Sequence, residues 1–245
     1  MHVLESTLEI TTYDALMAQV CAWAKEPRVH ALEFANTQTV TMRRHEPEFA
    51  QLLGAFDHLV PDGMPLVWCL NAAGAGMEDR VYGPTFMRLF LERAPADTTH
   101  YLLGGSEECG DLLVKRFSNA RVVGRWHGRA SMDGAVEDDA ALIDELDRLS
   151  PDFIWVGLGT PRQQGWVHRY KSQLKRGVIL SVGFAFDANA GLKADAPQWM
   201  QKRGLGWAHR LSTEPRRLLP RYLKWNSLFL YYLVRDGVKG RAFGR

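Results

Sequence analysis

Residues 153–164 read FIWVGLGTPRQQ, an apolar run followed by a glycine turn and then by a proline and a polar stretch. The run shows no alternation of polar and apolar residues, which predicts a strand covered on both faces, as in a parallel sheet. Proline followed by polar residues is typical of the start of a helix, with the proline at its first position. This stretch therefore predicts a strand, a glycine-rich turn and a helix, the repeating unit of an α/β fold.

The same order of elements continues on both sides of this stretch, without repeats or low-complexity segments. It predicts the α/β class, with a Rossmann-like parallel sheet flanked by helices. We predict strands at residues 31–35, 58–60, 100–103, 121–124, 153–157 and 178–183. We predict helices at residues 13–24, 46–56, 64–72, 84–94, 107–117, 136–149 and 162–174, and over much of the C-terminal segment.

The chain divides by length and charge into a core and an appendage. With 245 residues, of which 46% are hydrophobic, it suits one α/β core, residues 1–197, and a short helical appendage, residues 198–245. The appendage holds eleven Lys or Arg residues against two acidic residues, whereas the core holds 19 basic and 26 acidic residues. The appendage is therefore expected to meet a polyanion.

Aromatic residues lie among the bases of the appendage: Trp199, Trp207, Tyr222, Trp225, Phe229, Tyr231 and Tyr232. Arginine mixed with aromatic rings suits the surface of an anionic membrane, and it also suits stacked nucleic-acid bases. No recognised nucleic-acid module is present, so we expect an anionic membrane surface as the partner and do not expect nucleic acid.

The three cysteines, Cys21, Cys69 and Cys109, show neither paired nor metal-ligand spacing, which favours a reducing cytoplasm. The N-terminal residues form no apolar run, so we expect no signal peptide. The longest apolar run, residues 228–234, is far shorter than the roughly 20 residues that a spanning helix needs. We therefore expect a cytoplasmic protein whose membrane contact is peripheral. The composition leaves open whether it forms a homo-oligomer.

Ligands of an open α/β sheet bind beyond the carboxyl ends of its strands, so the residues after each predicted strand are the candidate site. Gly104 and Gly105 lead into a helix and offer bare backbone amides at its positive end, which suits a nucleotide diphosphate. The same glycines equally suit a tight turn without a ligand. Gly159 and Arg162 lie at another helix start, where donors gather, and a solvated helix start is the alternative there.

Two aspartates follow predicted strands. Asp62 lies between Pro61 and Gly63, in a turn that would fix its carboxylate at a strand end, as suits a general base. Aspartate is also common in such turns for conformational reasons alone. Asp187 either orients a sugar hydroxyl or caps a turn. The sequence shows no zinc-ligand spacing and no Asp-x-Asp pair, so we expect no metal and no cofactor, with basic residues of the appendage neutralising a diphosphate instead.

Six groups of residues occur in a recognisable order: Pro61-Asp62-Gly63; Tyr101-Leu102-Leu103-Gly104-Gly105; Val156-Gly157-Leu158-Gly159-Thr160-Pro161-Arg162-Gln163; Ala185-Phe186-Asp187 with Ala190-Gly191; Ala196-Pro197-Gln198-Trp199-Met200-Gln201; and Gly204-Leu205 through Trp207, Arg210-Leu211 and Glu214-Pro215-Arg216-Arg217. This order resembles the WecG/TagA/CpsF glycosyltransferases, glycosyltransferase family 26. The resemblance covers nearly the whole chain.

The resemblance implies an inverting, metal-independent transfer of a hexose or N-acetylhexosamine from a UDP-sugar to a polyprenyl-diphosphate-linked saccharide. It places that reaction at the inner face of the bacterial membrane, in surface polysaccharide synthesis. It implies that Asp62 takes the proton of the acceptor hydroxyl and that Gln163 contacts the donor or acceptor near the reacting centre. The basic appendage would reach the membrane and help to close the site over the diphosphate.

The residues expected to bind substrate follow from the same motifs. Backbone amides at Gly104 and Gly105 and the cations of the appendage would hold the leaving diphosphate. The full set is Asn36, Thr37, Gly63, Gly104, Gly105, Gly159, Arg162, Asp187, Arg210, Arg216 and Arg217.

The chain departs from the family pattern at six positions. Phe34 stands where the family has the Thr of Thr-x-Asn, so that hydroxyl is missing unless Thr37 supplies it. Where the family has Gly-Ser-Asp, this chain has Gly83-Pro84-Thr85 and lacks the carboxylate. Gln164 and Gly206 replace glutamates, and an arginine is replaced by aspartate before Ala196. The donor therefore stays open between UDP-N-acetylmannosamine, UDP-glucose and another UDP-hexose. A catalytically inactive or polyanion-binding protein on the same fold is the alternative function.

Overall fold

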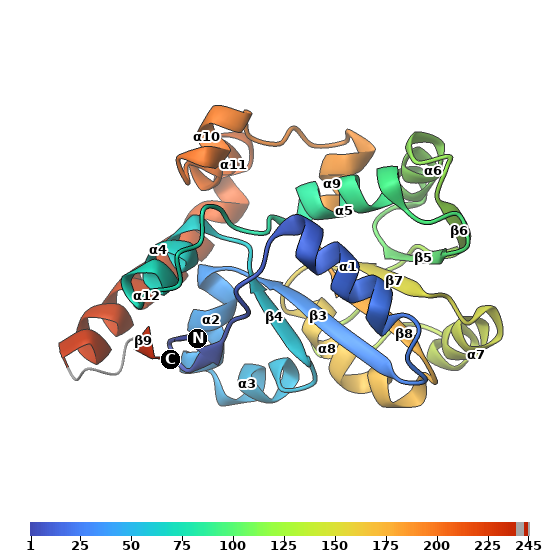
Figure 1. Ribbon diagram of the computed structural model, residues 1–245, viewed down its shortest axis with the longest axis horizontal. Helices are drawn as coiled ribbons and strands as arrows, with labels where there is room; N and C mark the ends of the chain where they lie inside the picture. Colours follow the sequence, from blue (N-terminus) through green and yellow to red (C-terminus); the bar gives the residue numbers. More distant parts are fainter. Residues whose placement is uncertain (239–242, 245) are drawn as a thin grey trace.

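A six-stranded parallel sheet organises the chain in the computed structural model, which describes residues 1–238 and 243–244 (Figure 1). Every pair of neighbouring strands runs parallel. In spatial order the strands are β4 (His58–Pro61), β3 (Val29–Ala35), β8 (Gly177–Ser181), β7 (Phe153–Gly157), β5 (Thr99–Gly104) and β6 (Arg121–Trp126).

The six predicted strands and the α/β class are confirmed, with small shifts at the strand ends. The last strand ends at Ser181, before the predicted Val182 and Gly183. The amides of both residues donate to the carbonyl of Val156, at 3.0 and 3.1 Å. This shared contact turns the chain out of the sheet and into the next helix.

Helices cover both faces of the sheet, as parallel strands require. The helices α1 (Tyr13–Trp23), α5 (Gly83–Arg93), α6 (Glu107–Arg116) and α9 (Ala185–Ala190) pack with one face in a cluster that contains the fully buried Trp155. The helices α3 (Pro47–Leu53), α7 (Asp139–Leu149) and α8 (Arg162–Tyr170), with the 3-10 turn η1 (Lys171–Gln173), cover the other face around Trp166.

The predicted helices of the core are confirmed, with shifts of up to four residues at their ends. The helix predicted from residue 136 begins at Asp139, because Val136 pairs with Ala130 in an isolated β-bridge. The helix α8 begins at Arg162, so Pro161 precedes the first helical position instead of filling it.

Two features were not predicted from the sequence. The helix α2 (Thr37–His45) is rich in threonine, which disfavours helix, but the Asn36 side chain accepts hydrogen bonds from the amides of Gln38 and Thr39 at its start. The strands β1 (His2–Val3), β2 (Ser6–Thr7) and β9 (Phe243–Gly244) form a small antiparallel sheet. Strands of two residues are too short for their pattern to stand out.

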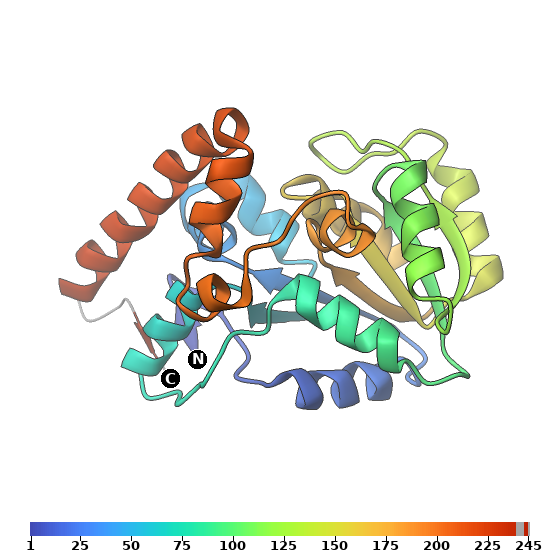
Figure 2. The same cartoon turned by 90° about the horizontal axis from the view of Figure 1, so that it is seen from above.

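Most of the C-terminal segment is helical, as predicted, and its described residues 243–244 form β9. It forms α10 (Gln198–Lys202), α11 (Gly206–Thr213) and the long helix α12 (Pro215–Val238). Figure 2 shows α12 running along one side of the molecule. Three of the appendage's eleven bases, Lys239, Arg241 and Arg245, lie outside the described residues. The division into residues 1–197 and 198–245 stays a prediction.

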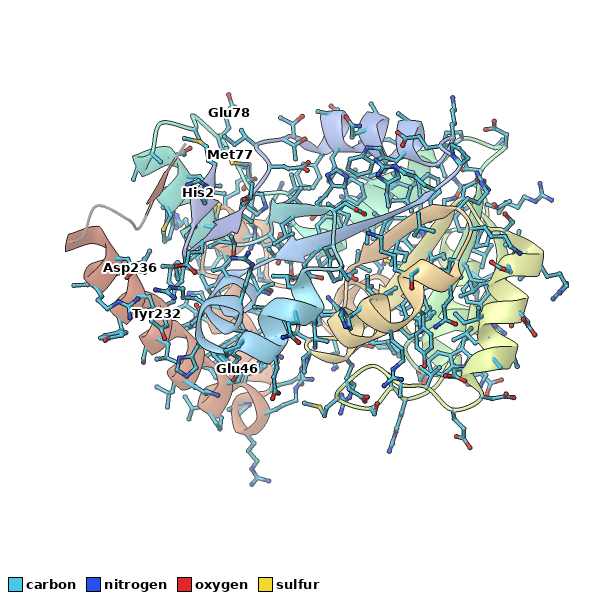
Figure 3. All side chains as sticks on the ribbon, turned by 90° about the horizontal axis from the view of Figure 1, so that it is seen from below. His2, Glu46, Met77, Glu78, Tyr232 and Asp236 are labelled. Carbon is cyan, nitrogen blue, oxygen red and sulfur yellow. The ribbon has the colours of Figure 1, made fainter. Side chains whose placement is uncertain are left out.

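The helix α12 packs on α2 and on a third apolar cluster that contains α4 (Met64–Ala72). The hydroxyl of Tyr232 lies 2.7 Å from Nδ1 of His45, and Asp236 pairs with Arg44 at 3.6 Å. Figure 3 shows Tyr232 and Asp236 on the side of α12 that meets the core. The ring of Trp225 is buried in the same cluster as Trp166. The appendage helix is therefore joined to the core by apolar and polar contacts.

We predict that Trp225→Ala lowers the free energy of unfolding by about 3–5 kcal/mol, because it removes a buried aromatic side chain and leaves a cavity. Leu230→Ala, on the same helix but 61% exposed, should change it by less than about 0.5 kcal/mol. Urea denaturation followed by circular dichroism measures both. Equal stability of the two variants would contradict the packing of α12 on the core.

Candidate active site

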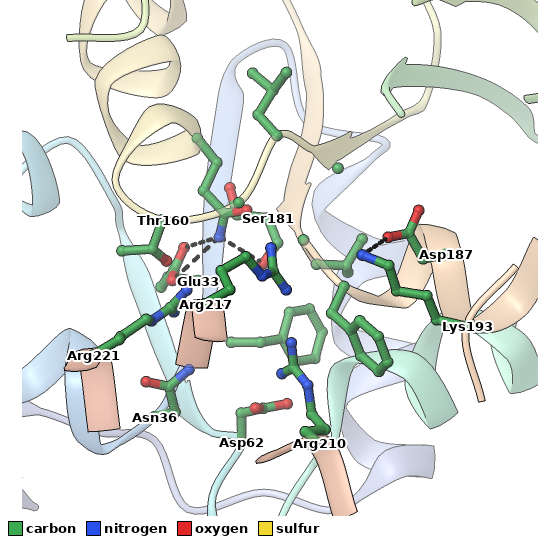
Figure 4. A pocket seen from close by; sticks show the side chains of 18 residues that line it. Glu33, Asn36, Asp62, Thr160, Ser181, Asp187, Lys193, Arg210, Arg217 and Arg221 are labelled. Carbon is green, nitrogen blue, oxygen red and sulfur yellow. Dashed lines mark hydrogen bonds and ion pairs between the residues drawn. The ribbon is translucent and has the colours of Figure 1, made fainter. Parts of the chain in front are cut away.

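A cavity of about 200 Å³ lies at the carboxyl ends of four neighbouring strands, β4, β3, β8 and β7. This edge of an open parallel sheet is where ligands bind. The turn after β7 and the turn after β8 form two of its walls, and side chains from α11 and α12 complete it. Figure 4 shows carboxyl groups and arginines pointing into the same space. The site therefore combines buried acids with converging cations.

Asp62 follows β4 and lines the cavity. Its Oδ1 accepts a hydrogen bond from the amide of Gly83 at 2.6 Å, and Arg80 donates to its carbonyl at 3.2 Å. Burial raises the pKa of this carboxyl to about 6, although Arg80, the Gly83 amide and Arg210 act in the opposite direction. At neutral pH Asp62 is thus mostly ionised, with a pKa close to the working pH, as suits a general base.

Glu33 is a second carboxyl in the same cavity, on β3, the strand next to the edge strand β4. It is 1% exposed. Nε2 of Gln164 donates to it at 2.7 Å, and Nε2 of Gln163 lies 3.3 and 3.4 Å from its two oxygens. Burial raises the pKa of Glu33 well above its usual range.

Three arginines from the C-terminal helices converge on the opening. Arg210 stacks over the ring of Phe184 at 4.0 Å, and Arg217 pairs with Glu214 at 2.6 Å. Arg221 donates to Oε1 of Gln38 on α2. The pKa of Arg221 is lowered by its burial and then by the nearby charges of Arg210 and Arg217. Repulsion among these cations would be relieved by an anionic ligand between them.

The model of the glycosyl transferase WecG/TagA/CpsF family matches residues 1–242 of the chain. The chain belongs to this family. Two relatives are each named N-acetylglucosaminyldiphosphoundecaprenol N-acetyl-beta-D-mannosaminyltransferase. The one from Bacillus spizizenii is 25% identical over 199 residues, which cover 77% of this chain and 75% of the relative. The one from Staphylococcus aureus is 24% identical over 206 residues, covering 82% of this chain and 78% of the relative.

Seven of the residues predicted for the site of this WecG/TagA/CpsF protein line one cavity: Asn36, Asp62, Gly159, Gln163, Asp187, Arg210 and Arg217. Asn36 also caps α2 through its side-chain oxygen. Asp187 pairs with Lys193 at 2.8 Å, and this ion pair holds the ammonium group of Lys193 at the cavity. Residues from six separate segments of the sequence are thereby brought together.

The other predicted residues lie outside the cavity lining. Thr37 donates to Asn226 of α12 at 3.3 Å, and Gly63 is the residue before α4. A Cβ atom on Gly104 would lie 3.0 Å from the backbone of Gly157, and one on Gly105 would lie 3.3 Å from Cys109 and Phe186. Gly104 therefore allows the ends of β5 and β7 to pack closely, and Gly105 lets the turn after β5 pack closely on α6 and α9. Arg162 and Arg216 are exposed at the starts of α8 and α12.

The departures from the family pattern lie in three places: at the main cavity, at a separate cavity and at the start of α11. Gln164 is buried against Glu33 in the floor of the cavity. Thr85 and Asp195 line a separate cavity, and Asp195 accepts a hydrogen bond from the hydroxyl of Tyr82 at 2.9 Å. Gly206 is the first residue of α11. Phe34 itself lines the main cavity and Gln164 lies against Glu33, so the exchanges at positions 34 and 164 are the ones found at the main cavity.

Three charged lining residues were missed in the sequence: Glu33, Lys193 and Arg221. Glu33 interrupts the apolar run 31–35, and a charged residue inside a strand covered on both faces was an available signal. Lys193 and Arg221 lie in polar or basic stretches that gave no reason to single them out. Their position depends on how the segments after β8 fold back over the sheet.

We predict that Arg217→Ala weakens the binding of inorganic diphosphate by about tenfold, because it removes a charged donor from the cavity opening. The neighbouring Arg216→Ala should leave this affinity nearly unchanged, since Arg216 lies outside the lining. Isothermal titration calorimetry at low salt measures both dissociation constants. Equal losses in the two variants would mean that only the general positive charge of α12 attracts the anion.

Proposed function

We propose that the protein transfers a sugar from a UDP-sugar donor to a polyprenyl-diphosphate-linked saccharide, with inversion at the anomeric carbon. The observation that carries the proposal is the pairing of Asp62, whose pKa is about 6, with three arginines around one cavity. A base and an anion site are the two parts that a single displacement on a sugar diphosphate needs. The printed names of the relatives support an acceptor linked through a diphosphate to a polyprenyl lipid.

In the proposed reaction Asp62 removes the proton from the acceptor hydroxyl. The oxygen attacks the anomeric carbon from the face opposite the diphosphate, the bond from that carbon to the diphosphate oxygen breaks, and UDP leaves with the electron pair. Arg210, Arg217 and Arg221 stabilise the charge that develops on the diphosphate. These three arginines would balance the negative charge of the diphosphate, so the proposed reaction does not require a metal ion. UDP-N-acetylmannosamine, UDP-glucose and another UDP-hexose are the candidate donors.

We predict that Asp62→Asn lowers acceptor-dependent release of UDP by at least about a hundredfold, because the amide cannot take the proton. In the wild type, kcat/KM should fall as the pH drops below about 6, where Asp62 becomes protonated. Rates measured across pH with a panel of UDP-sugars and a short-chain polyprenyl-diphosphate-sugar acceptor test both points.

Asp97→Asn is the matched control, since Asp97 is exposed just before β5, at the opposite end of the sheet. It should keep wild-type rates and the same pH profile. Full activity in Asp62→Asn would remove the proposed base. Binding of UDP without turnover of any donor would favour the alternative of an inactive, anion-binding family member.

Membrane contact at the inner face of the plasma membrane is the second part of the proposal. Four residues at helical spacing on α12, Leu219, Leu223, Leu230 and Val234, form an exposed apolar stripe. Bases of the same helix flank it, which suits the boundary between lipid tails and anionic headgroups. No helix among residues 1–238 is both long enough and apolar enough to cross a bilayer. These features support a peripheral contact through α12.

We predict that Leu223→Glu combined with Leu230→Glu weakens binding to anionic liposomes by at least about tenfold, because two leucine side chains leave the apolar layer. Val114→Glu, on the partly exposed surface of α6, is the control and should bind like the wild type. Co-sedimentation measures the bound fraction. Unchanged binding of the double variant would contradict the contact. Substitution is preferable to deleting residues 198–245, because that segment also supplies buried residues such as Trp225.

A further inference from the structure

Glu33 is an acid buried at the floor of the cavity without a cationic partner. No Lys, Arg or His pairs with it among the residues that the structure describes. Its contacts are the side-chain amides of Gln163 and Gln164, both on α8. A buried carboxylate without a counter-charge is costly, whereas a neutral carboxylic acid is not.

The hydrogen bonds around Glu33 also favour the neutral acid. Oε1 of Gln163 and Oε1 of Gln164 are buried and lack a hydrogen-bond partner. A carboxylate has no proton to give to either oxygen, but a carboxylic acid has one. Rotating the Gln164 amide by half a turn would let its Oε1 accept that proton across the 2.7 Å contact. The neutral form thus satisfies a buried acceptor that the ionised form leaves unpaired.

Gln163 joins this network to the cavity. Its Nε2 reaches Glu33 and lies 3.5 Å from the carbonyl of Ser181. Its Oε1 lies on the side of Gly183, 3.1 Å from the position that a Cβ atom there would take. Gln163 is 4% exposed and lines the cavity, and the hydroxyl of Ser181 beside it is also unpaired. These buried acceptors are suited to a hydroxyl or N–H group of a bound ligand.

We propose that Glu33 acts as a neutral acid and a positioning residue, which holds the two glutamine amides so that Oε1 of Gln163 faces the sugar of the donor. This inference rests on the proposed transfer from a UDP-sugar. Ionisation of Glu33 would remove its proton from the network and place a second negative charge in the cavity of Asp62. Donor binding should therefore weaken on the alkaline side.

Other charged groups line the same cavity: Asp62 after β4, Asp187 on α9, Lys193 after α9, Arg210 on α11, and Arg217 and Arg221 on α12. Of these, Asp62 acts on Glu33 and raises its pKa further. The helix α8 contributes only uncharged amides to this contact. If ionisation of Glu33 weakens donor binding at alkaline pH, the rise in donor KM must be absent when the Glu33 carboxyl is replaced. The rise must remain when an acid far from the cavity is replaced.

The first test uses Glu33→Gln, which keeps the size of the side chain, one donor group and one acceptor, and cannot ionise. The wild type should show a rise in donor KM at alkaline pH that is absent in Glu33→Gln. The exposed Glu48→Gln should keep this rise. A rise in KM that persists in Glu33→Gln would overturn the proposal.

The second test exchanges the acid and the amide between positions 33 and 164. Gln164→Glu alone places two acids within one hydrogen bond and should raise donor KM by about tenfold or more. The double variant Glu33→Gln with Gln164→Glu again has one acid and one amide, and should recover most of that loss. Failure of the double variant to improve on Gln164→Glu, with both variants folded by circular dichroism, would show that the pair does not work as a unit.

A third measurement needs no turnover, so it separates this inference from the proposed function. Infrared difference spectra between wild type and Glu33→Gln should show the carbonyl band of a neutral carboxylic acid at neutral pH. Because the pKa of Glu33 is raised on folding, its contribution to stability declines as the pH rises above its ordinary value of 4.5. Glu33→Gln should therefore gain thermal stability relative to the wild type as the pH increases.

The combined outcomes are distinguishable. Absence of the acid band, with no change in relative stability across pH, would overturn the neutral state of Glu33. A protonated Glu33 with no effect on donor KM would overturn its positioning role and leave the transfer reaction intact. Absence of turnover with every UDP-sugar would count against the proposed function alone, while titration of UDP-sugar binding to wild type and Glu33→Gln across pH still decides the positioning role.

Discussion

Burial of acidic groups at the ends of β3 and β4 is the constraint on which the site depends. Asp62 and Glu33 lie in one cavity, and water cannot solvate both freely there. Each is stabilised by a different means, Asp62 by a backbone amide and nearby arginines, Glu33 by neutral amides. Like acids in one cavity tend to separate in pKa, which lets one remain a base while the other keeps its proton.

The cations that balance this acidity come from the far end of the chain. Arg210, Arg217 and Arg221 belong to α11 and α12, whereas the acids belong to β3 and β4. The two regions are held together by the buried ring of Trp225 and by the contact between Tyr232 and His45. The site therefore exists only when the last helix lies on the core.

Much of the fold follows from local pattern, whereas part of the site does not. Runs such as residues 153–157 have no polar alternation, so strands covered on both faces were predictable. The strand-end rule also placed Asp62 and Gln163 correctly at the cavity. The sequence could not distinguish Arg216 from Arg217, because one helical step of about 100° separates them and only the docking of α12 decides which of the two lines the cavity opening. Nor could spacing show that Gly104 packs beside Gly157, that Gly105 packs beside Cys109 and Phe186, and that neither lines the cavity.

The helix α12 has three surfaces with different surroundings. One is buried on α2, one turns arginines toward the cavity, and one exposes a stripe of leucine and valine. These three surfaces belong to one helix. A ligand that binds one surface and stabilises the docked position of the helix therefore also favours the contacts made by the other two surfaces. If lipid binds the stripe more tightly when α12 is docked, thermodynamic reciprocity requires that lipid raise the affinity for the anion and that the anion raise the affinity for lipid by the same factor. An anionic ligand and a bilayer would then each stabilise the docked position of the last helix, and the site would be most complete where both are present.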